Sequence, residues 1–291
     1  MTEVNLIEHV DFKNQLGEGV TWDARNNTLW WIDILSNQLF CWPEGKSVIT
    51  YDTPFQLCSF GLTQSPNTLV AAFDSGFALY TPATQGVKWL CKVEEELAGT
   101  RLNDGKVDRS GCFWAGSMAT NESQAIGSLY KLKQGDFEQV RTGITISNGL
   151  SWNQAGTRVY HADSPTRTIH VAEIEPDSGN IGAWQPFVKT NRGAYPDGAC
   201  IDSDDCLWSA QWGSSKIKRY DPQGNEIFSL DVPCSQPSCV AFGGGDLDLL
   251  FVTSATVGLD NNVSDSQRLD GSLLVYQTPF RGVKEPICTL S

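Results

Sequence analysis

Short apolar runs separated by polar turns cover the chain. The runs are five or six residues long, rich in β-branched and aromatic residues, and bounded by Gly, Pro, Asn or Asp, which is typical of β-strands. One short segment, Val93–Ala98, is the single helical candidate. We therefore predict an all-β chain. Its predicted strands are 28–33, 38–42, 68–73, 76–80, 112–116, 127–132, 158–162, 168–172, 206–210, 216–220, 249–253 and 272–276.

A short phrase recurs before these strands. An oxygen-bearing side chain stands next to a glycine, and an apolar run follows. Four clear copies and two degenerate copies share one register, at positions 18, 60, 104, 148, 197 and 238. Successive copies are 41 to 49 residues apart, which is the period of propeller blades. The sequence therefore predicts a six-bladed β-propeller that occupies residues 1–291 as a single domain.

The segment Val4–Val10 resembles a lone strand before the first copy of the phrase. Propellers close their ring with a strand from the other terminus, because closure removes an open sheet edge. We therefore expect this segment to complete the last blade. The ten tryptophans suit the spaces between packed blades, which large aromatic side chains fill.

Composition narrows the class of partner. The formal net charge of −13 argues against nucleic acid and against an anionic membrane surface, since both need a basic footprint. No apolar run approaches the roughly 18 residues of a membrane span, and the first residues lack the pattern of a secretory leader. Nine scattered cysteines without a C-x-x-C pair are typical of reduced thiols that pack as small hydrophobes. We expect a cytoplasmic protein, and no protein partner is inferred.

The phrase itself has two interpretations. Asn-Gly and Asp-Gly are the commonest tight-turn dipeptides, so any one copy alone predicts a turn. The shared register changes this interpretation, because equivalent positions of six blades meet near one axis. Glu18, Asp104, Asn148 and Asp197 occupy those positions. Clustered carboxylates repel one another, and a bound divalent cation is the simple compensation.

The ligand types indicate the class of metal. Glu18, Asn148 and Asp197 offer oxygen atoms only, and none of the three histidines lies in the phrase. Oxygen ligands suit calcium, magnesium or manganese better than copper or structural zinc. Three protein ligands leave coordination positions for water and substrate, as a catalytic metal requires. The sequence contains no G-x-S-x-G elbow, P-loop or G-x-G-x-x-G motif.

These motifs resemble the SMP-30/gluconolactonase/regucalcin-like family of six-bladed propeller lactonases. The resemblance spans the whole chain and lies in residues 16–19, 101–108, 116–118, 147–150, 163–167, 195–198 and 243–255. It implies one divalent metal at the top of the central channel, held by Glu18, Asn148 and Asp197. Calcium is the first expectation, with zinc, manganese, magnesium or iron(II) as alternatives.

The resemblance also implies substrate contacts. The R-x-N-D-G stretch, here Arg101, Asn103 and Asp104, faces the substrate in the family. A loop after residues 116–118 carries an acidic residue that touches the sugar in some relatives, and Asn121 falls at that position by direct count.

The expected activity is hydrolysis of a gluconolactone-like sugar aldonolactone to the aldonic acid, within carbohydrate metabolism. Asp197 is the expected general base, with Asp104 as the alternative, and Asn103 the expected donor to the developing oxyanion. Two other functions stay open, namely hydrolysis of a non-sugar ester or phosphotriester on the same metal, and calcium-binding regulation without turnover. The in-register ligands argue against a third possibility, a pure interaction scaffold.

Overall fold

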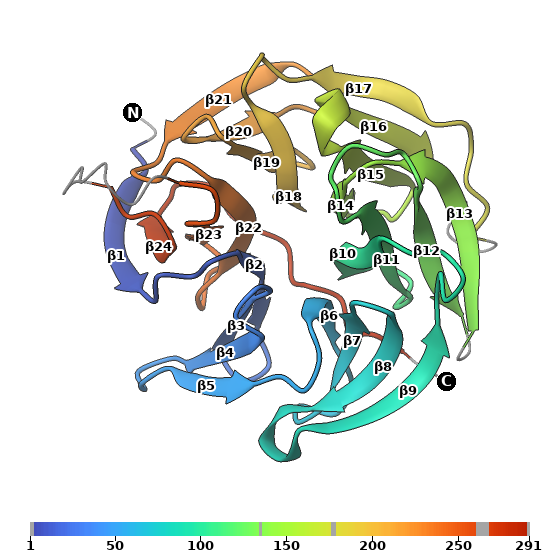
Figure 1. Ribbon diagram of the computed structural model, residues 1–291. Helices are drawn as coiled ribbons and strands as arrows, with labels where there is room; N and C mark the ends of the chain where they lie inside the picture. The colour runs from blue at the N-terminus through green and yellow to red at the C-terminus, as the bar shows by residue number, and fades with distance from the viewer. Residues whose placement is uncertain (1–2, 134–135, 176–178, 260–267, 290–291) are drawn as a thin grey trace.

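Six four-stranded antiparallel sheets stand around a central axis like the blades of a propeller (Figure 1). The computed structural model describes residues 3–133, 136–175, 179–259 and 268–289. The predicted fold class is confirmed. Across the described ranges no helix is long and apolar enough to cross a membrane. Met1 and Thr2, the start of the segment in which a secretory leader was sought, lie outside the described residues.

Each blade consists of four strands, numbered from the axis outward. Blade 1 comprises β2 (Gly17–Asp23), β3 (Thr28–Asp33), β4 (Gln38–Pro43) and β5 (Ile49–Asp52); blade 2 comprises β6 (Leu57–Leu62), β7 (Leu69–Phe73), β8 (Gly76–Thr81) and β9 (Gly86–Lys92). Blade 3 comprises β10 (Thr100–Val107), β11 (Phe113–Ala119), β12 (Gly127–Lys133) and β13 (Asp136–Ile144); blade 4 comprises β14 (Ser147–Trp152), β15 (Arg158–Asp163), β16 (Thr168–Glu173) and β17 (Gln185–Lys189). Blade 5 comprises β18 (Tyr195–Ile201), β19 (Leu207–Trp212), β20 (Lys216–Tyr220) and β21 (Glu226–Asp231); blade 6 comprises β22 (Pro237–Gly243), β23 (Leu249–Ser254), β24 (Ser272–Gln277) and β1 (Asn5–Asp11). Two 3₁₀ turns, η1 (Pro82–Thr84) and η2 (Ser164–Thr166), complete the elements.

The ring closes through the N-terminal strand, as predicted. Strand β1 pairs antiparallel with β24 and becomes the outermost strand of blade 6. Residues from the two ends of the chain therefore share one sheet. The pairing covers the edge of β24, which would otherwise offer free backbone groups to another chain.

The one helical candidate, Val93–Ala98, is not a helix. This segment forms turns between β9 and β10, with Glu94 in a left-handed conformation at φ 56°. A left-handed residue cannot continue a right-handed helix. The conformation points the Glu94 carboxylate at two hydroxyls, and it accepts hydrogen bonds from Ser117 at 2.6 Å and Tyr130 at 2.8 Å.

The recurring phrase forms a bulge inside each innermost strand that carries a clear copy. The register shifts after Glu18 in β2 and after Asn148 in β14, and it also shifts in β10 and β18. Bulges re-aim a side chain without ending the strand. Gly19 and Gly149 adopt positive φ angles of 61° and 65°, which glycine tolerates best. The dipeptides are therefore not hairpin turns.

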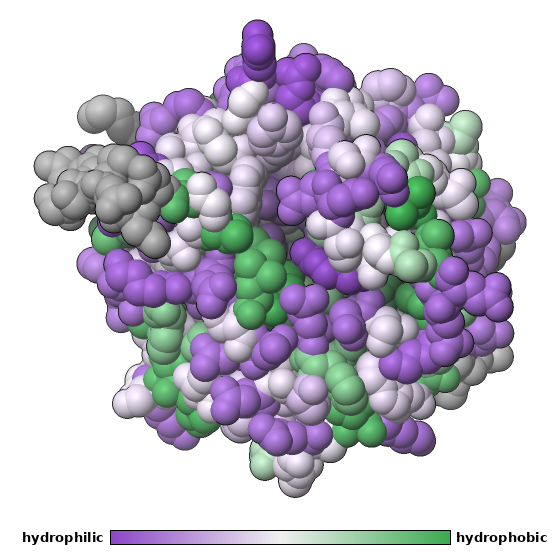
Figure 2. Space-filling view, viewed as in Figure 1, coloured by the Kyte–Doolittle hydropathy of each residue, from purple (hydrophilic) through white to green (hydrophobic). Residues whose placement is uncertain are grey.

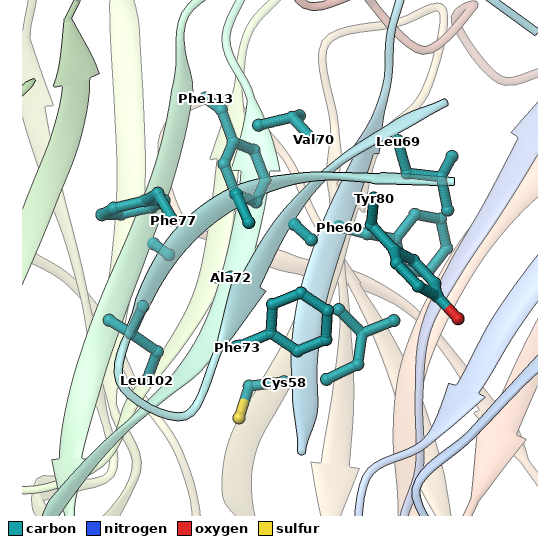
Figure 3. Packing of buried hydrophobic residues seen from close by; sticks show 14 of the residues in the cluster. Cys58, Phe60, Leu69, Val70, Ala72, Phe73, Phe77, Tyr80, Leu102 and Phe113 are labelled. Carbon is teal, nitrogen blue, oxygen red and sulfur yellow. The ribbon is translucent and has the colours of Figure 1, made fainter. Parts of the chain in front are cut away.

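Hydrophobic packing lies between neighbouring blades, as Figure 3 shows for blades 2 and 3. Phe77 on β8 meets Phe113 on β11 edge-on, with ring centroids 5.9 Å apart. Both side chains are fully buried, and edge-to-face contact is a favoured geometry for aromatic rings. All nine cysteines are free and seven are buried, in agreement with their interpretation as small hydrophobes.

The C-terminal segment crosses one end of the central channel (Figure 1). Its backbone pairs with blades 2 and 3, where the Cys288 N–H donates to Leu62 O at 2.7 Å and the Thr289 N–H to Gly111 O at 2.9 Å. Within the channel, Glu285 forms a partly buried ion pair with Lys106 at 3.4 Å. This end of the channel is therefore filled by the chain itself.

A buried aspartate anchors blades 3 and 5, a feature that the sequence analysis did not identify. Asp202 accepts hydrogen bonds from the Cys206 amide at 3.0 Å, the Trp208 indole at 2.8 Å and the Arg219 guanidinium at 2.6 Å. Asp108 has the same relation to Cys112 and Trp114. The shared spacing Asp-x₃-Cys-x-Trp is the signal in the sequence.

We expect Asp202→Ala to lower the free energy of unfolding by about 3–5 kcal/mol, because it removes the buried partner of the buried Arg219 and leaves only an exposed one. Asp204→Ala is the matched control. Asp204 also pairs with Arg219, at 2.8 Å, but its side chain is 70% exposed, so its loss should cost less than about 1 kcal/mol. Chemical denaturation of both variants measures the difference. Equal losses would contradict the assignment of Asp202 as the anchor.

Candidate active site

A cavity of about 480 Å³ opens at the end of the channel opposite the C-terminal segment. Figure 2 shows the hollow at the centre of this face. Glu18, Asn148 and Asp197 line it, each from the bulged innermost strand of a different blade. Residues far apart in the sequence thus meet in one cavity, as the shared register predicted.

Hydrogen bonds fix the orientation of the Asn148 amide. Its Nδ2 donates to the Ser164 hydroxyl at 2.8 Å, and this hydroxyl donates to the carbonyl of Pro196 at 2.7 Å. The nitrogen is therefore directed toward η2, and Oδ1 is the atom left for a ligand role. Because Pro196 precedes Asp197, the same contact connects the two candidate ligands from β14 and β18.

Asn103 is occupied within this network. Its Nδ2 donates to Ser147 O at 2.9 Å and to Asn148 Oδ1 at 3.1 Å, and its Oδ1 accepts from Arg101 at 2.7 Å. An amide has two N–H donors, so neither is left for an oxyanion. Within the described residues, Arg101 contacts the protein through one nitrogen, Nη1. Its other N–H groups are available to a bound molecule.

Two predicted substrate residues lie outside the cavity lining. Asp104 lies deeper in the channel, where its carboxylate accepts the Leu150 amide at 3.0 Å. Asn121 is exposed and bonds back to Ser123 within its own loop at 3.1 Å. The next residue, Glu122, lines the cavity instead. Counting along the loop therefore selected a residue whose side chain stays in the loop.

Burial and mutual repulsion raise the pKa values of the carboxylates in the channel. Burial raises the pKa of Glu18 well above its usual range, and repulsion from Asp197 and Asp104 adds to the increase. Burial likewise raises the pKa of Asp197 well above its usual range, with a further contribution from Asp104. Burial raises the pKa of Asp104 as well, although the Leu150 amide opposes the shift.

This donor set fits a hard divalent cation. The buried carboxylate of Asp197, the half-buried carboxylate of Glu18 and the oriented amide oxygen of Asn148 are oxygen ligands of the type that calcium, magnesium and manganese prefer. A nearby positive charge would favour the ionised forms of Glu18 and Asp197 and offset their desolvation. The residues that can hold a cation are therefore Glu18, Asn148 and Asp197, and the rest of the cavity remains open.

A buried histidine supports this arrangement, and the sequence analysis did not identify it. His161 is fully buried; Arg141 lies 3.0 Å from its Nδ1, and the Ser147 hydroxyl lies 2.9 Å from its Nε2. Since arginine only donates, Nδ1 accepts and Nε2 carries the proton. Burial and the neighbouring Arg141 charge lower the pKa of His161 well below its usual range. The neutral ring fixes Ser147, whose carbonyl accepts from Asn103.

Comparison with known proteins gives a family match. Residues 16–256 match the SMP-30/Gluconolactonase/LRE-like region. An L-arabinolactonase of Azospirillum brasilense is 35% identical over 280 residues, which cover 94% of this chain and 92% of that protein. A 6-deoxy-6-sulfogluconolactonase of Pseudomonas putida is 32% identical, over 94% of both chains.

A solved structure has the same fold throughout. The calcium-binding protein regucalcin of Agrobacterium tumefaciens superposes with a TM-score of 0.91 and 28% sequence identity, over 98% of both chains. The likeness includes all six blades, since both chains are covered almost completely.

We expect a divalent cation to stabilise the protein through this donor set. At a calcium or manganese concentration about 100 times the dissociation constant, binding should contribute about 2.7 kcal/mol, or roughly 5 °C in Tm for a chain of this size. Asp197→Ala should abolish the increase, because one of the two carboxylate ligands is lost. Thermal scans of metal-free protein with and without added cation measure the effect. Full metal content in Asp197→Ala by elemental analysis would contradict the assignment.

Proposed function

The chain belongs to the SMP-30/gluconolactonase/LRE-like family, and we propose that it hydrolyses a gluconolactone-like sugar aldonolactone to the aldonic acid with one bound divalent cation. The observation that carries the proposal is the meeting of Glu18, Asn148 and Asp197 in a cavity beside the unoccupied donors of Arg101. The names of the lactonase relatives support the same reaction class.

Glu18, Asn148 and Asp197 would hold the cation, with calcium as first choice and zinc, manganese, magnesium or iron(II) as alternatives. When bound, the cation supplies Lewis-acid polarisation of the lactone carbonyl. The network from Ser164 to Asn103 holds the Asn148 oxygen in place, so the ligand set is organised before the substrate arrives.

Asp197 is the general base in this proposal. Its Oδ1 accepts the amide of Gly198 at 3.0 Å, and the carboxylate would accept a proton from the attacking water. As water oxygen bonds to the carbonyl carbon, Asp197 takes that proton. It returns the proton to the ring oxygen when the carbon–oxygen bond of the lactone breaks, and the product is the open acid. Positioned proton transfer of this kind contributes roughly 10²–10⁴ in rate.

Arg101 replaces Asn103 as the donor to the substrate. Its available N–H groups can stabilise the negative charge that develops on the carbonyl oxygen, or can hold a ring hydroxyl. Glu122, which lines the same cavity, can accept a hydrogen bond from a substrate hydroxyl. Asn103 acts through Asn148 as a positioning residue.

Calcium-binding regulation is the second candidate, because the Agrobacterium relative is described as a calcium-binding protein. A cavity with an available guanidinium has no use in a protein that only buffers calcium. Hydrolysis of a non-sugar ester or phosphotriester is the third candidate. A panel of aldonolactones, aryl esters and phosphotriesters, assayed with each metal, separates the three functions.

We expect Asp197→Asn to lower kcat by about 10² or more on sugar lactones, since the amide keeps an oxygen ligand but cannot take a proton. The assay follows acid release with a pH indicator. Metal content by elemental analysis is the control. Near wild-type turnover in a metal-loaded Asp197→Asn variant would place the general base elsewhere.

Arg101→Ala should raise KM or lower kcat for lactones while the dissociation constant of the cation changes little. The physical reason is that a guanidinium binds the polar substrate and not another cation. Steady-state kinetics and a metal titration of the same preparation measure both quantities. A fall in Tm with unchanged kinetics would instead make Arg101 a structural residue.

A further inference from the structure

Ser147 stands directly before the candidate ligand Asn148 on β14, and its side chain is fully buried. Its carbonyl accepts a hydrogen bond from Asn103 Nδ2 at 2.9 Å, and the same Nδ2 donates to Asn148 Oδ1 at 3.1 Å. A displacement of Ser147 would therefore move the oxygen atom that Asn148 offers to a cation by two routes, along the strand and through Asn103.

Two residues from neighbouring blades contact the Ser147 side chain. Gly116 of β11 lies so close that an added Cβ would stand 1.8 Å from Ser147 Oγ, and no side chain fits at that position. His161 of β15 has its Nε2 atom 2.9 Å from the same oxygen. Ser147 is therefore held by close approach to blade 3 and by a hydrogen bond within blade 4.

The His161 ring is itself held by Arg141 and Trp184. Arg141 belongs to β13, the outermost strand of blade 3, and its Nη1 lies 3.0 Å from His161 Nδ1. The ring centroids of Trp184 and His161 are 5.8 Å apart, and the Arg141 guanidinium lies 5.0 Å from the same indole. Contacts between a guanidinium and an indole are favourable, and a donor at Nδ1 leaves the ring proton on Nε2. The ring is therefore fixed with its N–H directed at Ser147.

Neither His161 nor its two partners reach the cavity. Its described lining includes Asn103 and Asn148 but not Arg141, His161 or Trp184. Any effect of these residues on a bound cation has to be exerted through Ser147 and the two amides.

We propose that His161, held by Arg141, is a positioning residue that sets the affinity of the Glu18, Asn148 and Asp197 site for its cation. The inference rests on the proposed function, because it requires that these three residues bind a cation. It adds a determinant of affinity that lies in the packing of blades 3 and 4, outside the cavity. Replacing residues that orient metal ligands from behind changes metal affinity by about 10–100-fold.

Two amide substitutions of His161 separate positioning from packing. A glutamine places its amide nitrogen close to where the ring has Nε2, whereas an asparagine amide reaches only the position of Nδ1. His161→Asn should raise the dissociation constant of calcium or manganese about tenfold, the lower end of the range for indirect partners. His161→Gln should leave it near the wild-type value. Isothermal titration calorimetry of metal-free protein measures both constants, and equal constants in the two variants would overturn the inference.

His170→Asn is the matched control. His170 lies directly opposite His161 on β16 and is half-buried, and it takes no part in the contacts described above that lead to Asn148. Its substitution should leave the dissociation constant unchanged, and an increase as large as that in His161→Asn would overturn the inference. Wild-type protein that binds neither calcium nor manganese would overturn the proposed function as well.

The tautomer of the His161 ring gives a test on the unaltered protein. NMR spectroscopy of protein with isotope-labelled histidine nitrogens shows which ring nitrogen carries the proton, and the spectrum of His161→Gln identifies the signals that belong to His161. We expect the proton on Nε2, because Arg141 donates to Nδ1. A ring protonated on Nδ1 alone would overturn the role of Arg141 and the directed N–H that the proposal requires.

Discussion

The antiparallel pairing of β1 with β24 is the constraint on which the rest of the molecule depends. This pairing joins the first strand of the chain to the last blade, so the six sheets must complete a circle. In a closed circle the innermost strands face one axis, and their bulges aim side chains at it. The cavity therefore arises from long-range pairing, because no local loop could bring Glu18, Asn148 and Asp197 together across such distances in the sequence.

Carboxylates gathered at one axis are destabilised by desolvation and by mutual repulsion. Hydrogen bonds from several parts of the chain offset this cost. The Leu150 amide donates to the carboxylate of Asp104, which lies deeper in the channel. Nearer the cavity, side-chain hydrogen bonds fix the orientation of Asn148. The chain of contacts from Arg141 through His161 and Ser147 connects a blade interior to the candidate ligands. Fully satisfied buried networks of this kind rigidify a site. The geometry of the candidate ligands at the axis therefore depends on the side chains that are packed within the blades.

The sequence predicted the fold well because strands and blades leave periodic signals. The two middle strands of each blade lie close to their predicted ranges, and the recurring phrase marked the innermost strands. The half-exposed outer strands such as β5 and β21 have weak patterns and were not located. Register placed Asp104 and Asp197 at equivalent positions. It could not show that the Asp104 carboxylate turns toward the Leu150 amide. It could not separate Asn121 from Glu122 either, since backbone angles in a loop decide which side chain reaches the cavity. His161 carries no pattern at all, because its role exists only through its neighbours.

The C-terminal segment fills the far end of the channel, where Glu285 pairs with Lys106, and so leaves the channel open at one end. In a channel open at both ends, a reactant can enter at one end while its product leaves at the other. In a cavity with one entrance, the product must leave before the next substrate can bind. For the proposed hydrolysis, the released acid and the next lactone therefore compete for the same entrance. Accumulated acid would slow turnover simply by occupancy, without any separate regulatory site.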